Sequence, residues 1–153
     1  MIWGDSPYAA RALSAVAGSM AVICSVYVVG AIAGPRAGIV CGLLTAFLPI
    51  AIRYSQEARM YALLSFLLLA SLLALTAWVT NPDRKKYLFW YVFFSVLAIY
   101  THYFAALAIA SSWVYLFFLS VRRFRGYNFV LRPLWWWANL FIAISYVPWA
   151  FSL

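Results

Sequence analysis

The sequence has very few charged residues. Only 9% of its 153 residues are charged and 68% are hydrophobic, whereas roughly a quarter of an average soluble domain is charged. Acidic residues are the scarcest, with three against eleven basic ones. A chain so poor in charge is suited to lipid as its main solvent, so we predict an integral membrane protein.

Cysteine and histidine are scarce as well. Cys24 and Cys41 lie inside apolar runs, without CxxC or histidine-rich spacing, so both are interpreted as small buried residues and not as disulfide or metal partners. The net charge of +8 would indicate nucleic acid in a soluble protein. Here the basic residues lie in short loops between apolar runs, where they set membrane topology, and no nucleic-acid binding is expected.

Apolar runs account for almost the whole chain, and each is close to the roughly 20 residues that cross a bilayer as a helix. We therefore predict an all-α fold, a polytopic transmembrane helix bundle of about six spans that covers residues 1–153. The predicted spans lie near residues 12–33, 37–52, 60–80, 88–101, 103–121 and 133–152.

Helix-breaking and polar residues separate these spans. A glycine- and proline-containing turn at 34–38 follows the first span, and Pro49 is expected to kink or unwind the second. The apolar run 88–121 would be about 50 Å long as one helix, too long for a core of about 30 Å. We therefore place a reversal at residues 100–103, which read YTHY.

The distribution of lysine and arginine predicts the orientation. The loops at 34–38, 81–87 and 122–132 hold eight basic residues, and they alternate with the segments 53–61 and 100–103, which hold two. The basic loops are therefore assigned to the cytoplasm, and the other two segments to the extracytoplasmic face. Aromatic belts are expected at both interfaces: Tyr54, Tyr61, Tyr100 and Tyr103 outside, and Trp78, Tyr87, Trp90 and Tyr91 inside.

Residues 53–61, reading RYSQEARMY, concentrate charge between two apolar runs, where ionisable groups are costly and mark functional sites. Arg53 and Glu57 are four residues apart, so a helix would pair them in a structural ion pair, and Glu57 also suits a helix N-terminus. The alternative is a binding site. One glutamate cannot neutralise both Arg53 and Arg59, which leaves a guanidinium able to bind a phosphate, such as that of a lipid headgroup.

His102, within YTHY, leaves three interpretations open. It could hydrogen-bond a phosphate, join Glu57 as a metal ligand, or remain neutral against a carbonyl.

Three segments carry a resemblance to a known family: SPYAARALSAVAG at 6–18, GPRAGIVCGLLTAFLPIAIRYSQEARMYAL at 34–63 and LAIYTHYFAAL at 97–107. In this order they resemble the GT-C-fold membrane glycosyltransferases of glycosyltransferase family 39, the protein-mannosyltransferase-like and RgtA/B/C/D-like group. The resemblance implies transfer of a sugar, with inversion, from a polyprenyl-phosphate donor to a glycan, lipid or protein acceptor. The expected location is a bacterial-type cell membrane, with the site on its extracytoplasmic side.

The residues predicted to bind substrate are those of the two polar motifs: Arg53, Gln56, Glu57, Arg59, Tyr61, His102 and Tyr103. No catalytic residue is assigned within the chain. The resemblance places the family's catalytic base in an acidic loop that would lie upstream of Met1, and Asp5 does not match that loop. We therefore expect a fragment or an incorrect start site at Met1, inactive alone. No cofactor is assigned, and a divalent metal remains open.

Two other functions remain open. One is a small non-catalytic membrane protein, such as a lipid-linked-sugar translocation partner or a transporter subunit, whose charged cluster holds a headgroup. The other is a structural bundle in which the cluster only caps helices.

Overall fold

The computed structural model describes residues 7–56, 60–122 and 128–150. Within these ranges the chain forms helices and short connections and no strand, which confirms the all-α prediction for this part of the chain. The helices are α1 (Pro7–Ala33), α2 (Pro35–Phe47), α3 (Pro49–Gln56), α4 (Tyr61–Thr80), α5 (Lys85–Thr101), α6 (Ala105–Val121) and α7 (Pro133–Ala150).

A single residue, Gly34, joins α1 to α2. Its φ of 93° lies in the left-handed region that glycine adopts without steric cost. Pro35 then occupies the first position of α2, where its missing N–H is not needed. The predicted turn at 34–38 is therefore tighter than expected, since α2 already includes Arg36 and Gly38.

The second apolar run is interrupted at Leu48, which has extended backbone angles (φ −66°, ψ 117°) between α2 and α3. Proline disfavours helical angles in the residue before it, so Pro49 ends α2 and starts α3. The break expected near Pro49 is present, and it leaves an eight-residue helix that ends within the charged cluster.

The reversal expected at YTHY is also present. Helix α5 ends at Thr101, His102 is extended (φ −161°, ψ 135°), and α6 begins at Ala105. The backbone N–H of Ala105 donates to the carbonyl of His102, which closes the turn at 3.0 Å.

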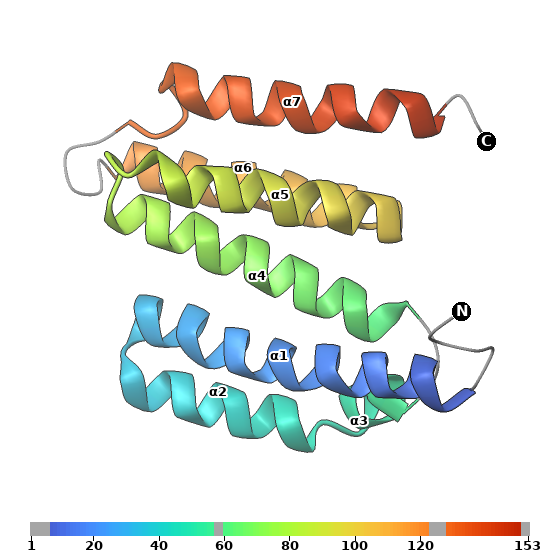
Figure 1. Ribbon diagram of the computed structural model, residues 1–153. Coiled ribbons are helices and arrows are strands. Elements are labelled where there is room, and N and C mark those ends of the chain that lie inside the picture. Colours follow the sequence, from blue (N-terminus) through green and yellow to red (C-terminus); the bar gives the residue numbers. More distant parts are fainter. Residues whose placement is uncertain (1–6, 57–59, 123–127, 151–153) are drawn as a thin grey trace.

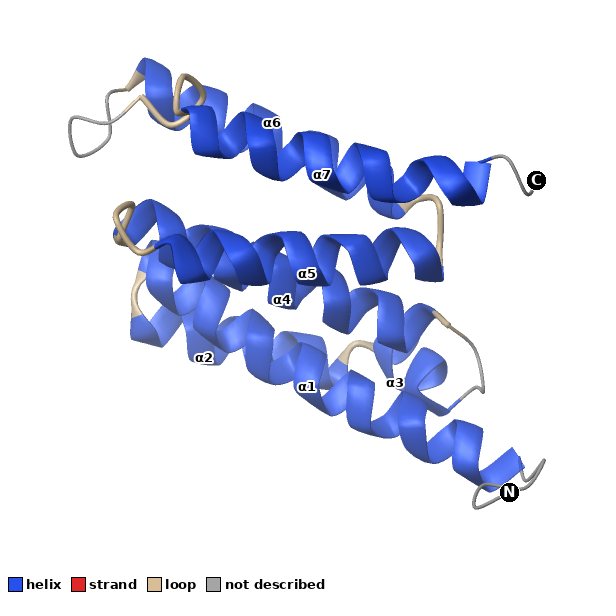
Figure 2. Ribbon diagram, turned by 45° about the horizontal axis from the view of Figure 1, so that its top comes forward, coloured by secondary structure: helices blue, strands red, loops and turns tan. Residues whose placement is uncertain are grey.

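The long helices run antiparallel to their neighbours along the chain (Figure 1). Helix α4 is central and contacts α1, α5 and α6, while α2 packs on α1 and α7 packs on α5. Figure 2 shows the same layers after rotation, with α1, α2 and α3 on one side of α4 and α5 and with α6 and α7 on the other.

Different helix connections lie at the two ends of the bundle. The α1–α2 and α4–α5 connections lie at one end with the end of α6 and the start of α7, and we call this the basic end. The end of α3, the start of α4 and the α5–α6 connection lie at the opposite end, which we call the motif end.

Two helical segments of the described chain are long and apolar enough to cross a bilayer, Arg11–Ala33 and Tyr61–Thr80. Pro35–Phe47 and Ala105–Val121 are apolar but shorter. A helix of 13 residues such as α2 reaches only about 20 Å. The arrangement into six membrane spans therefore stays a prediction.

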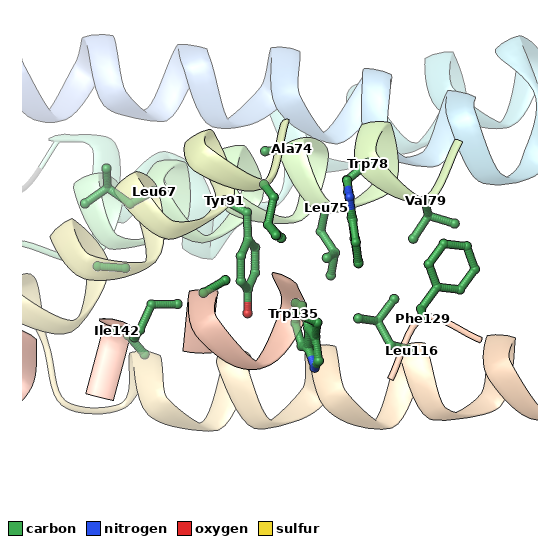
Figure 3. Close-up of a cluster of buried hydrophobic side chains, with 14 of the residues drawn as sticks. Leu67, Ala74, Leu75, Trp78, Val79, Tyr91, Leu116, Phe129, Trp135 and Ile142 are labelled. Carbon is green, nitrogen blue, oxygen red and sulfur yellow. The ribbon is translucent and has the colours of Figure 1, made fainter. Parts of the chain in front are cut away.

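The core is built around Trp135 of α7 (Figure 3). Its ring stacks on Trp78 of α4, with ring centroids 6.0 Å apart and planes 13° apart, and contacts Tyr91 of α5 at 5.4 Å and Trp113 of α6 at 5.2 Å. Trp78, Tyr91 and Trp135 have no exposed surface. The prediction that Trp78 and Tyr91 belong to an interfacial belt is therefore wrong, because both rings face neighbouring helices.

Helices α1 and α2 approach each other closely because glycine lines the contact. Gly38 and Gly42 of α2 are buried, and a Cβ atom on Gly38 would lie 2.9 Å from Gly30 Cα and 3.0 Å from Gly30 N of α1. The spacing of Gly38 and Gly42 is the GxxxG pattern of closely packed membrane helices. The GxxxG pattern could therefore have predicted this close contact from the sequence, although the prediction of spans does not include it.

A buried hydrogen bond between hydroxyl groups joins Ser71 of α4 to Ser95 of α5 at 2.9 Å. We expect the Ser71→Ala and Ser95→Ala substitutions to be coupled by about 0.6 kcal/mol, the average for such bonds between membrane helices. A double-mutant cycle on the free energy of unfolding in detergent measures this coupling. Ser65 bonds only to the carbonyl of Tyr61 on its own helix, so a cycle of Ser65→Ala with Ser95→Ala should give none. Equal coupling in both cycles would contradict the prediction.

Candidate functional site

The charged motif begins on α3. Arg53 is exposed and lies in the last turn of α3, which ends at Gln56. Glu57, Arg59 and the side chain of Gln56 lie outside what the structure describes, so the predicted Arg53–Glu57 ion pair and the surplus charge on Arg59 stay predictions. The helix break at Leu48 therefore has a consequence for the site, because it places Arg53 on a short helix of its own at the motif end.

The first residues of the chain also lie outside the described residues. This applies to Met1 and to Asp5, the acidic residue that precedes α1. The expectations that Met1 is not the true start and that a catalytic base lies upstream of it therefore stay predictions. No catalytic residue is assigned among the described residues.

Tyr61 brings the two polar motifs together. It is the first residue of α4 and is half-buried. Its ring centroid lies 6.1 Å from that of His102, with the planes inclined at 37°. The ends of RYSQEARMY and YTHY are therefore neighbours in space, because the packing of α5 on α4 aligns the first turn of one helix with the last turn of the other.

His102 is held by its own turn. Its Nδ1 atom accepts a hydrogen bond from the backbone N–H of Phe104 at 3.2 Å. A ring nitrogen that accepts a hydrogen bond carries no proton, so the neutral ring has its proton on Nε2. Nδ1 therefore faces an N–H group and not the carbonyl that one interpretation expects. Nε2 is the atom of His102 that could donate a hydrogen bond to a ligand.

Aromatic rings flank the histidine. Tyr103 stacks on His102 with centroids 4.6 Å apart, and Phe104 lies nearly parallel to it at 5.0 Å. Tyr103 and Phe104 are 55% and 54% exposed. The site residue Tyr103 therefore presents its surface at the motif end and limits the rotation of the imidazole ring.

An apolar cavity of about 560 Å³ lies between α1, the α2–α3 break and α4. Its walls include Ile50 and Ile52, just before Arg53, and Ala62, just after Tyr61. The polar side chains in these walls are those of Ser19, Thr45 and Ser65, and each hydroxyl donates to a carbonyl of its own helix. The motif end therefore combines a cation and a histidine with an adjoining apolar space.

Comparison of the chain with protein-family models, with curated proteins and with solved structures finds no match.

The described residues contain no group of three or more histidine, cysteine, aspartate or glutamate side chains that could hold a metal ion. The ring contacts of His102 are with aromatic side chains, and its predicted metal partner Glu57 lies outside these residues. A divalent metal at this site therefore stays an open alternative.

Two contributions to the site are absent from the sequence prediction. The prediction places Tyr100 in an aromatic belt, but its hydroxyl donates to the carbonyl of Ser145 at 2.6 Å and so ties the end of α5 to α7. The cavity is not predicted either, although the break at Pro49 is a usable signal. A helix that unwinds beside two others leaves space that its own side chains do not fill.

Proposed function

We propose that this chain is part of a membrane glycosyltransferase that takes a sugar from a polyprenyl-phosphate donor, with the donor phosphate bound at the motif end. The proposed fold is a GT-C-type transmembrane bundle in which six helices cross the membrane. The acceptor, a glycan, lipid or protein, approaches from the extracytoplasmic side.

Exposed apolar side chains support the membrane location. Large hydrophobic residues are more than half exposed along α1, α2, α6 and α7, among them Leu44, Phe47, Leu107 and Trp137. Water-soluble monomers rarely expose continuous apolar surface of this kind, whereas a bilayer covers it. The two helices of spanning length add to this support.

The observation that carries the proposal is the contact between Tyr61 and His102. Tyr61 and His102 are 41 positions apart in the sequence, and their contact brings two polar motifs together at one end of the bundle, as a shared ligand requires. A structural role for RYSQEARMY alone, as a helix cap, would not need YTHY beside it.

The chemistry of the described residues suits a phosphate on an apolar chain. Arg53 supplies a guanidinium, which binds phosphate through two parallel hydrogen bonds, and Nε2 of His102 supplies an N–H donor. The adjoining cavity gives the first isoprene units an apolar wall. Cationic groups at this position would stabilise the phosphate as it leaves the sugar. Arg59 is the second expected cation.

Donor binding tests the proposal directly. The chain is reconstituted in lipid nanodiscs, and its affinity for a radiolabelled polyprenyl-phosphate sugar is measured. Arg53→Ala should weaken binding roughly 10- to 100-fold, as expected for loss of a hydrogen-bonded charge. Arg53→Lys should recover part of the loss, because it keeps the charge without the two-pronged geometry.

Arg36 provides the matched control. It is likewise exposed but lies at the start of α2, at the basic end. Arg36→Ala should leave donor affinity unchanged. Equal losses for both variants, or equal binding of a polyprenol without phosphate, would reject a phosphate site at the motif end. In an intact enzyme that contains this segment, unchanged sugar transfer by Arg59→Ala would count against the role of Arg59.

A further inference from the structure

A second apolar space lies between α5 and α7, on a different face from the candidate site. This groove has a volume of about 580 Å³ and is lined by residues such as Leu88, Val92 and Leu97 of α5 and Trp137 and Phe141 of α7. Every residue of its lining is apolar except Lys85, the first residue of α5. The groove therefore has a positive charge at the basic end and hydrocarbon along the rest of its length.

Acidic groups near Lys85 are few. The sequence contains only three acidic residues, and Asp83 is the only one in the described part of the chain. Its carboxylate lies 3.5 Å from Arg132, whose guanidinium also donates to the carbonyl of Pro82. Lys86, the neighbour of Lys85, instead lies over the ring of Tyr87 at 5.1 Å. The single described carboxylate is therefore paired with another cation.

The start of α5 adds to this positive charge. Its first turn has no acidic residue and its N-cap residue, Arg84, makes no side-chain cap hydrogen bond. Acidic residues or caps usually stabilise this end of a helix, where the backbone N–H groups carry partial positive charge. Two lysines occupy the first turn of α5 instead, so an anion placed beside Lys85 would be attracted by both the ammonium group and the helix end.

The length of the groove fits one leaflet of a bilayer. From Lys85 to Leu97 the helix rises about 18 Å at 1.5 Å per residue, and one leaflet contributes about 15 Å of hydrocarbon. A fatty acyl chain of an ordinary phospholipid fits this length, whereas a polyprenyl chain is much longer.

We propose that the groove between α5 and α7 binds an anionic phospholipid, with its headgroup phosphate on Lys85 and one acyl chain along the groove. The inference depends on the proposed membrane location but not on the proposed glycosyltransfer. The lipid would fill the space between the two helices and neutralise the start of α5.

The test uses phosphatidylglycerol that carries a photoreactive diazirine on one acyl chain, added to the full chain in phosphatidylcholine nanodiscs. Labelled positions, found by mass spectrometry, should concentrate on the groove residues of α5 and α7. Unlabelled phosphatidylglycerol should compete, and inorganic phosphate should not. Lys85→Gln should weaken phosphatidylglycerol binding about fivefold, the typical effect of one basic residue at a membrane surface.

Lys86→Gln is the matched control. It removes the same charge one position along α5, outside the groove lining, and should leave labelling within twofold of the wild type. Circular dichroism should show both variants folded, since both lysines are exposed. Equal losses for the two variants, equal labelling by a photoreactive phosphatidylcholine, or labelling spread over all helices would overturn the site. If a second copy of the chain occupied the groove, the lipid would not label it and cross-linking would give a dimer. That result would assign the groove to the second copy instead.

The two proposals fail separately. Lys85→Gln should leave binding of the polyprenyl-phosphate sugar unchanged, and Arg53→Ala should leave labelling of the groove unchanged.

Discussion

Replacing Gly38 with alanine should cost the protein about 3 kcal/mol or more of its free energy of unfolding. The added Cβ would overlap the backbone of α1, at the carbonyl oxygen of Val26 and at Gly30, where its distance to Cα would be only 2.9 Å. Backbone cannot rotate away as a side chain can, so the two helices must separate. Overpacking of a core commonly costs about 1 to 3 kcal/mol. A clash of the new Cβ atom with the backbone of α1 should cost at least the upper value of this range. Denaturant titration in detergent, followed by circular dichroism, measures the change.

Two other glycines provide matched controls on the same pair of helices. A Cβ atom on Gly42 would meet a methyl group of Val26, which can move only if the side chain rotates, whereas Gly38→Ala requires movement of the backbone; Gly42→Ala should therefore cost less than Gly38→Ala. Gly30 has open space around its Cβ position. Gly30→Ala should therefore stabilise the helix by up to about 1 kcal/mol through its higher helix propensity. A different order of the three variants would show that the α1–α2 contact is not as close as described.

Removing the ring of Trp135 should have an effect of similar size on the other half of the bundle. Trp135→Ala deletes contacts with Trp78, Tyr91 and Trp113, one from each of three other helices. Substitutions of this type in protein cores cost about 3 to 5 kcal/mol. Trp135→Phe should cost less, because Nε1 of Trp135 has no hydrogen-bond partner to lose among the described residues. Thermal unfolding followed by near-ultraviolet circular dichroism would report the loss of ring packing.

Trp137 is the control for this substitution. It lies two residues further along the same helix and is 68% exposed. In detergent without added phospholipid, Trp137→Ala should change the stability by no more than about 0.5 kcal/mol, the usual range for surface positions. A destabilisation equal to that of Trp135→Ala would show that the exposed face of α7 is also packed.

The course of the helices could be predicted from local chemistry. Gly34 with Pro35, Pro49, and Asn81 with Pro82 end helices for reasons that act within a few residues. The apolar runs between them are long enough to state the all-α class. The eight-residue helix α3 is not predicted as a separate element. A proline predicts a break without showing whether the chain resumes its helix on the other side.

Burial of the aromatic residues could not be predicted in this way. Helices α4 and α5 are apolar around most of their circumference, so the sequence gives no periodic stripe to mark the inner face. Trp90 is 46% exposed, whereas Tyr91, the next residue, is fully buried. Tyr91 is the buried one of the two because it faces Trp135 of α7, and the position of α7 cannot be derived from the sequence of α5.

The candidate site was predictable in part. Counting helix reversals along the sequence places RYSQEARMY and YTHY at the same end of the bundle, and the helices alternate in direction as this count requires (Figure 1). The approach of Tyr61 to His102 needs the additional fact that α5 packs directly on α4. The hydrogen bond from the backbone N–H of Phe104 to Nδ1 of His102 depends on the geometry of the turn, which the sequence motifs alone do not predict.

The alternating direction of the helices has a practical consequence. Helix α1 begins and α7 ends at the motif end (Figure 1). If the helices cross the membrane as proposed, a reporter enzyme or fluorescent tag joined beyond either helix would read the same compartment, and in the proposed orientation that compartment is outside the cytoplasm. Tags placed in the α4–α5 connection would read the opposite one. Sidedness can thus be mapped with fusions that leave the packed helices untouched.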